Sequence, residues 1–185
     1  MRTKTVLILT LFISATISFR CSKSRDRISG PAGDENLLIN SSFEINGDPS
    51  LSGWAVSDTS RVHFSNDVPP DGGSWSISIS PGWAPIFYSV TTTVAPPVGT
   101  HRYKLSFWTK SPQEWGSARL FLKRPDTLMV SCSLSFSDSS WATHSLLDTL
   151  SITSGDSLVV MLTGSWPEIG MGRTHFDLVR LEKLH

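Results

Sequence analysis

Alternation of apolar and polar positions with a period of two dominates the chain from residue 37 onward. It is clearest in residues 75–80, 103–109, 118–123, 130–136, 158–163 and 175–181. Clusters of Gly, Pro, Asp and Ser separate these segments. Short alternating runs bounded by turn residues predict β-strands, and about eight strands at this spacing predict an all-β fold, a two-sheet antiparallel β-sandwich.

The alternation also assigns side chains to the two faces of each strand. Phe107 falls on an inward face, which leaves Trp108 on the outward face. In the next segment Leu120 points inward, so Arg119 and Phe121 point outward. Outward aromatic and basic side chains are therefore predicted on two neighbouring segments.

The first 21 residues have the order of a secretion signal. Basic residues precede an apolar run over residues 6–17, which is too short to span a bilayer as a helix. Cys21 follows, and residues 22–35 have the composition of a flexible tether. This order resembles bacterial lipoproteins, which implies lipidation of Cys21 and export to the cell envelope, at the outer membrane or in the periplasm. The alternative is an ordinary cysteine in a signal that is cleaved nearby, and the protein is then secreted. This alternative arises because Phe19 and Arg20 stand where lipoprotein signals usually have small residues.

Cys132 is the only other cysteine, so the chain can form at most one internal disulfide. It alternates in register with Val130, Leu134 and Phe136, which predicts a buried position on one face of a strand. Lipidation of Cys21 would leave this residue as a free, buried thiol.

The charge balance excludes several partners. The 185 residues include 16 basic and 16 acidic side chains, and three of the basic ones lie within the first 20 residues. The remainder carries 13 basic and 16 acidic residues, or a net charge of −3. Such a body is unsuited to nucleic acid or an anionic membrane surface, so a lipid anchor is the only membrane contact expected. Residues 36–185 have the size of a single domain, and a monomer is expected.

Four segments resemble a known family. They are Asn36-Leu-Leu-Ile-Asn-Ser-Ser-Phe-Glu44 with Ser52-Gly-Trp54, Gly73-Ser-Trp-Ser-Ile-Ser-Ile79, Tyr103-Lys-Leu-Ser-Phe-Trp-Thr-Lys110, and Phe176-Asp-Leu-Val-Arg-Leu181. In this order they resemble the carbohydrate-binding modules of xylanases and cellulases, which have a galactose-binding-like jelly-roll fold. The resemblance covers about residues 36 to 183. It implies a non-catalytic module that binds a polysaccharide or glycan.

The resemblance also implies a structural Ca²⁺. In such modules the carboxylates that correspond to Glu44 and Asp177 meet at one edge of the sandwich, and Asp71 and Gly73 are the turn residues placed to contribute. Hard oxygen ligands from distant segments suit Ca²⁺. The alternative is that both acids are surface carboxylates or turn caps.

A sugar site needs exposed aromatic rings with polar groups around them. The expected ligand-binding residues are the outward or turn residues Trp108, Phe121, Arg119, Phe87, Trp83 and Trp115, with Trp108 foremost. Two other tryptophans, Trp54 and Trp75, are expected in the core.

Two sequence features could suggest catalysis, an esterase-like motif and a pair of loop acids, and neither has the context that an enzyme needs. Residues 155–158 spell Gly-Asp-Ser-Leu, an esterase motif, but they precede a predicted strand rather than follow one in an α/β domain, which favours a turn. Glu114 and Glu168 are acids beside loop tryptophans, which does not by itself indicate a glycosidase pair. We therefore expect no enzyme. The alternative to glycan binding is a structural or adhesion-type β-sandwich with no sugar ligand.

Overall fold

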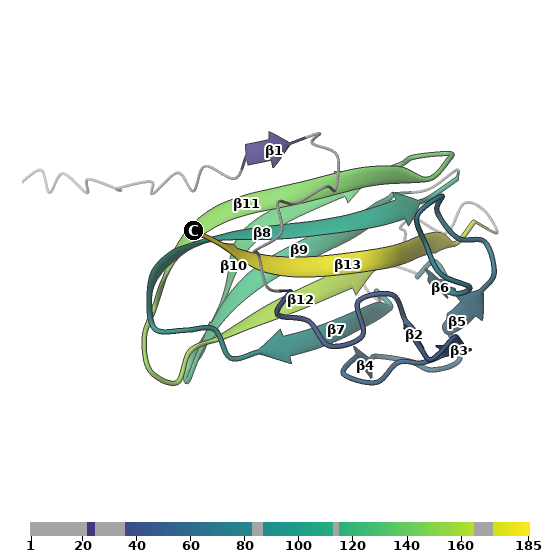
Figure 1. Cartoon of the computed structure of the whole chain (residues 1–185). Coiled ribbons are helices and arrows are strands. Elements are labelled where there is room, and N and C mark those ends of the chain that lie inside the picture. The colour runs from purple at the N-terminus through teal and green to yellow at the C-terminus, as the bar shows by residue number, and fades with distance from the viewer. Residues whose placement is uncertain (1–21, 25–35, 83–86, 113–114, 165–171) are drawn as a thin grey trace, which may run out of the picture.

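The computed structural model describes residues 22–24, 36–82, 87–112, 115–164 and 172–185 (Figure 1). The strands are β1 (Ser22–Ser24), β2 (Glu44–Ile45), β3 (Asp48–Pro49), β4 (Ala55–Val56), β5 (Val62–Ser65), β6 (Ser76–Ile79), β7 (Ser89–Val94), β8 (Gly99–Lys110), β9 (Gly116–Arg124), β10 (Thr127–Phe136), β11 (Ala142–Ile152), β12 (Ser157–Thr163) and β13 (Thr174–Leu184). No described residue belongs to a helix, so the described chain has no helix long and apolar enough to cross a bilayer.

Two antiparallel sheets face each other, as the two layers of Figure 1 show. The six-stranded sheet has the order β1-β11-β8-β13-β6-β5, and the five-stranded sheet has the order β10-β9-β12-β7-β4. Strands β2 and β3 form a small separate hairpin. The predicted all-β, two-sheet antiparallel sandwich is confirmed.

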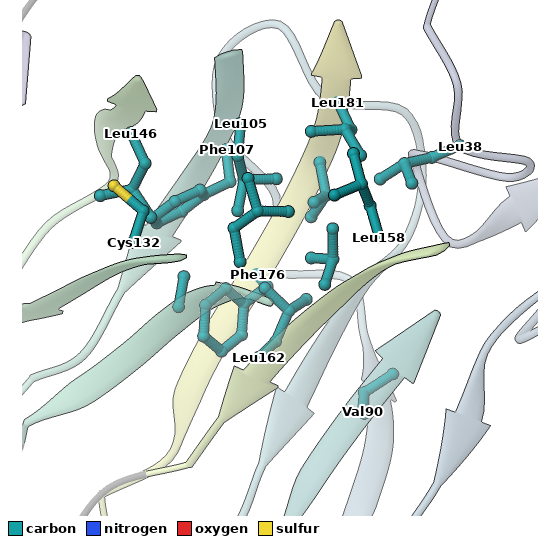
Figure 2. Packing of buried hydrophobic residues seen from close by; sticks show 14 of the residues in the cluster. Leu38, Val90, Leu105, Phe107, Cys132, Leu146, Leu158, Leu162, Phe176 and Leu181 are labelled. Carbon is teal, nitrogen blue, oxygen red and sulfur yellow. The ribbon is translucent and has the colours of Figure 1, made fainter. Parts of the chain in front are cut away.

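The core lies between the inner faces of the sheets, where period-2 alternation places apolar side chains (Figure 2). From β8 it takes Leu105 and Phe107, and from β12 Leu158 and Leu162, all fully buried. Leu120 of β9 is buried as predicted. Burial of this apolar surface is the main term that holds the two sheets together.

The two tryptophans expected in the core differ. Trp54 is buried against Phe43, with 5.1 Å between the ring centroids. Trp75 is only half-buried directly before β6, where it makes an edge-to-face contact with Phe64 and its Nε1 donates to the Gly47 carbonyl at 3.1 Å. The core prediction is therefore wrong for Trp75, because its indole N–H finds a partner at the surface instead.

A β-bulge in β10 separates Val130 from Cys132. Val130 pairs with Phe121 on the outer face and is half exposed, so it does not share the face of Cys132 as expected. Cys132 is buried at 2% exposure, as predicted (Figure 2). It is disulfide-bonded, however, so the expectation of a free thiol is wrong. The other cysteine of the chain, Cys21, lies outside the described residues.

The segment that leads into the domain runs beside β13. The side chain of Asn36 holds it there, because its Oδ1 accepts hydrogen bonds from the backbone N–H of Leu38 at 3.2 Å and of Leu181 at 3.0 Å. Further along, the N–H of Val179 donates to the Ser41 carbonyl at 2.8 Å. These contacts bring the start of the domain to its last strand and position Glu44 near β13.

Candidate functional site

A hollow of about 400 Å³ opens on the outer face of the five-stranded sheet. Its lining residues are Phe87, Trp115, Gly116, Ser117, Arg119, Ser135, Thr163 and Gly164. The volume is within the usual range for a small-molecule site. Two of the lining rings are open to solvent, since Phe87 is 50% and Trp115 61% exposed. Exposed rings beside polar side chains are what a ligand with apolar faces and a polar rim requires.

Strand register explains how the polar part of the hollow forms. Ser117 of β9 pairs with Ser135 of β10 on one side and with Thr163 of β12 on the other. Their side chains therefore form one row of hydroxyls about 10 Å across. Arg119 lies two residues along β9 on the same face, about 7 Å from Ser117.

Three of the six predicted ligand-binding residues line this hollow, namely Phe87, Trp115 and Arg119. Phe121 has the predicted outward parity, but it is only 6% exposed and offers no open ring face. Trp108 is half-buried on the outer face of the six-stranded sheet, so it does not belong to the hollow. The sixth, Trp83, lies outside the described residues.

Sequence reasoning missed the row of hydroxyls. Ser117 has the same outward parity as Arg119, which was a usable signal. Ser135 and Thr163 gave no such signal, because their place beside Ser117 depends on strand order and register. The loop residues Glu114, Trp166 and Glu168 lie outside the described residues.

The face of the six-stranded sheet that carries Trp108 is occupied by a polar cluster. The Asp67 carboxylate accepts hydrogen bonds from Lys110 Nζ at 2.6 Å and from Trp141 Nε1 at 2.9 Å. Burial raises the pKa of Asp67, but these two hydrogen bonds outweigh it and hold the pKa below its usual value. The Trp141 ring meets His175 edge-on, with centroids 6.0 Å apart, and burial lowers the pKa of His175. Asp67, Lys110 and Trp141 thus bond to one another, which is typical of a structural cluster, whereas His175 Nδ1 has no hydrogen-bond partner among the described residues.

Glu44 and Asp177 come close together at the turn over residues 69–73, the place where the resemblance puts the metal. A Cβ atom placed on Gly73 would lie 1.7 Å from Glu44 Oε1, and one placed on Gly72 would lie 2.6 Å from Asp177 Oδ2. Both carboxylates are therefore packed against the backbone of this turn. Glu44 Oε2 accepts the N–H of Ser74 at 2.8 Å. The turn thus closes over both acids.

Local backbone geometry directs the two carboxylates. Phe43 precedes Glu44 with φ 56°, and Leu178 follows Asp177 with φ 48° within a bulge of β13. Left-handed conformations at non-glycine residues cost free energy, and they persist where the surroundings enforce them. Asp177 consequently turns toward the loop from the outer face of its sheet, opposite Trp108 in the register.

Asp177 is fully buried, and its Oδ2 has no hydrogen-bond partner among the described residues. Its Oδ1 accepts the N–H of Leu178 at 2.7 Å. Burial raises the pKa of Asp177 to about 7, and the negative charge of Glu44 adds to this. Two carboxylates and an unsatisfied buried oxygen suit a hard cation.

No group of three Asp, Glu, His or Cys side chains that could hold a metal occurs among the described residues, so backbone oxygens would have to complete the shell of ligands. Asp71 is exposed, and no described contact joins it to either acid.

The esterase-like motif lies where the turn after β11 leads into β12, with Gly155 and Asp156 before the strand and Ser157 and Leu158 in it. Asp156 is buried, and its Oδ2 accepts the N–H of Thr153 at 2.8 Å and the Thr153 hydroxyl at 2.9 Å. The backbone hydrogen bond from Thr153 lowers the pKa of this carboxylate. Gly155 has φ 88°, which a turn allows. The interpretation of residues 155–158 as a turn that leads into a strand is confirmed.

Comparison with known proteins gives structural neighbours only. No protein-family model matches the sequence, and no curated protein matches it. Among solved structures, a family 61 carbohydrate-binding module in complex with β-1,4-galactotriose is similar at a TM-score of 0.57 and 19% identity, over 81% of this chain and 99% of that module. A family 16 carbohydrate-binding module is similar at a TM-score of 0.58 and 19% identity, over 79% of this chain and 99% of that module.

The enzymatically active domain of bacteriophage CBA120 tailspike protein 4 is also similar, at a TM-score of 0.61 and 20% identity. That match covers 80% of this chain and 21% of the tailspike chain, so this chain spans only part of the length of that protein. Identities of this size establish a shared fold. The predicted jelly-roll fold, shared with carbohydrate-binding modules, is therefore confirmed.

Proposed function

We propose that this protein is a non-catalytic carbohydrate-binding module and that the hollow on the five-stranded sheet is its glycan site. The observation that carries the proposal is the placement of Phe87 and Trp115, both open to solvent, beside the hydroxyls of Ser117, Ser135 and Thr163. A sugar ring has an apolar C–H face and hydroxyls at its edge, so it can stack on a ring while the hydroxyls hydrogen-bond to the row.

The fold supports the same function. Similar modules were solved with β-1,4-galactotriose and, as part of a xylanase, with xylohexaose. Another hollow among the described residues, about 340 Å³ between Leu37, Ile39, Gly53 and residues 92–95, is lined by neither aromatic nor charged side chains. Of the two, only the hollow with Phe87 and Trp115 has the groups that a sugar needs.

Glycan binding can be tested by affinity electrophoresis and calorimetry of the purified protein with β-1,4-galactan, xylan and their oligosaccharides. Trp115→Ala and Phe87→Ala should each weaken binding at least about tenfold, because truncated aromatic anchors typically cost that much. Phe64→Ala is the matched control, since Phe64 is a partly exposed aromatic residue of the other sheet.

The variant Trp108→Ala makes the test decisive between the sheets. It should leave affinity unchanged. If it abolished binding while Trp115→Ala had no effect, the site would lie on the six-stranded sheet and this assignment would be wrong. If no glycan bound, the protein would be a structural or adhesion-type module.

We also propose that Glu44 and Asp177 hold a structural Ca²⁺. The unsatisfied buried Oδ2 of Asp177 and the packing of both carboxylates against the same turn support this. Carbonyl oxygens of the turn over residues 69–73 would supply further ligands. A bound dication would neutralise the two acids and tie the start of the domain to β13, so chelation should lower the melting temperature.

For localisation, we propose an exported protein whose cysteines form a disulfide. Disulfides persist in oxidising compartments, and Cys132 is disulfide-bonded. Ser22 pairs with Leu147, whose carbonyl oxygen lies 3.8 Å from Cys132 Sγ. Cys21 precedes Ser22 and is the only other cysteine in this sequence, so an internal disulfide would use the sulfur atom that a lipid anchor needs.

A further inference from the structure

Arg119 is the one feature of the hollow that neutral sugar binding does not require. The rest of the described lining consists of aromatic rings, hydroxyls and glycines, and Arg119 is its only charged residue. The ion pairs formed among the described residues do not include it. Its guanidinium is thus available to a ligand.

The surroundings of Arg119 on the sheet add no negative charge. Its partners in the register are Ser133 of β10 and Met161 of β12, which are both neutral. Lys123 lies further along β9 with the same parity and is exposed. Among the described residues, the register partners of Arg119 therefore leave its positive charge uncompensated, and this charge attracts anions.

A second polar group in the hollow lacks a partner. Thr163 is only 4% exposed, and its Oγ1 forms no hydrogen bond with any described residue. An unsatisfied buried hydroxyl costs free energy that a ligand atom can recover. It lies one strand from Ser117, at the base of the row of hydroxyls.

We propose that the hollow selects an acidic glycan, in which a sugar carries a carboxylate or a sulfate ester. Arg119 binds the anionic group, because its planar fork of N–H donors matches two oxygens at once. Phe87 and Trp115 contact the faces of the sugar rings, and the Thr163 hydroxyl bonds to a sugar oxygen. The proposal rests on the glycan-binding function above and adds the chemical class of the ligand.

The test compares glycans that differ in charge. Affinity for polygalacturonan, its methyl-esterified form, sulfated carrageenan and neutral β-1,4-galactan is measured at 0.15 M and 0.5 M salt. The acidic polymers should bind at least about tenfold more tightly than the neutral ones, as expected for charge-assisted hydrogen bonds. The polygalacturonan and carrageenan measurements distinguish a carboxylate from a sulfate ligand.

Two variants separate a specific contact from general attraction. Arg119→Gln should remove the preference for acidic polymers, whereas Lys123→Gln, which removes the same charge outside the hollow, should retain it. Thr163→Val should weaken binding of every glycan that binds the wild type.

The outcomes distinguish the two proposals. Equal or tighter binding of neutral galactan that still depends on Trp115 would overturn the acidic preference and leave the glycan function in place. An acidic preference that both Arg119→Gln and Lys123→Gln reduce equally would also overturn it. Absence of binding to these four polymers and to xylan would overturn the glycan function itself.

Discussion

Replacement of Asp177 by Asn should stabilise the calcium-free protein at pH 8. The folded protein raises the pKa of Asp177 to about 7 from an ordinary 3.8, mainly by burial, with repulsion from Glu44 adding to it. That difference corresponds to about 4 kcal/mol of stability, an upper value for a side chain that is fully buried. Asn keeps the oxygen that accepts the Leu178 N–H and removes the charge.

The direction of the pH dependence follows from the raised pKa. A carboxyl whose pKa is higher in the folded state binds its proton more tightly there, so its contribution is fully present below about pH 4 and is lost as the pH rises toward 7. In chelator, wild-type stability should therefore contain a term that falls between about pH 4 and pH 7. His175 contributes with the opposite sign, because burial lowers its pKa, so the difference between wild type and Asp177→Asn isolates the aspartate.

Calcium should reverse the order of the two proteins. A bound cation favours the ionised carboxylate, so in excess Ca²⁺ the wild type should gain stability and lose this pH dependence, while Asp177→Asn gains little. Urea denaturation in EDTA and in CaCl₂, at pH 5, 6, 7 and 8, measures all of these quantities. A variant that is less stable than wild type in EDTA at pH 8 would refute the reasoning about the buried charge. Equal stabilisation of both proteins by Ca²⁺ would refute the proposed metal site.

Two further predictions concern the ends of the domain. Asn36→Ala should lower the free energy of unfolding, measured by urea denaturation, by about 1–3 kcal/mol, because the N–H groups of Leu38 and Leu181 lose the acceptor that they share. An unchanged free energy would mean that water replaces the Asn36 oxygen at no cost. Peptide mapping of the exported protein without reductant should recover Cys21 joined to Cys132. Reduction of this disulfide should lower the free energy of unfolding by about 2–4 kcal/mol. A diacylglycerol adduct on Cys21 would exclude the disulfide.

The sequence by itself determined the fold class and several of the residues that the structure brings together. Period-2 alternation depends on local backbone geometry alone, so the strand segments, the burial of Leu120 and the outward parity of Arg119 and Phe121 could all be predicted. The resemblance of the end segments to known modules also paired Glu44 with Asp177, which the structure places at one turn.

Only the tertiary structure decided which outward residues form a site. Parity assigns a side chain to one of two faces, but it does not say which sheet a strand joins or what covers it. Trp108 and Arg119 have equivalent parity, yet β8 and β9 belong to opposite sheets. Phe121 points outward and is nevertheless buried.

The register of the hydrogen-bonded strands connects residues that lie far apart in the chain, and it places Ser135 and Thr163 beside Ser117. The bulge at residue 131 likewise changes the face on which Val130 lies. Pairing over long range, rather than local pattern, therefore sets the position of the proposed glycan site.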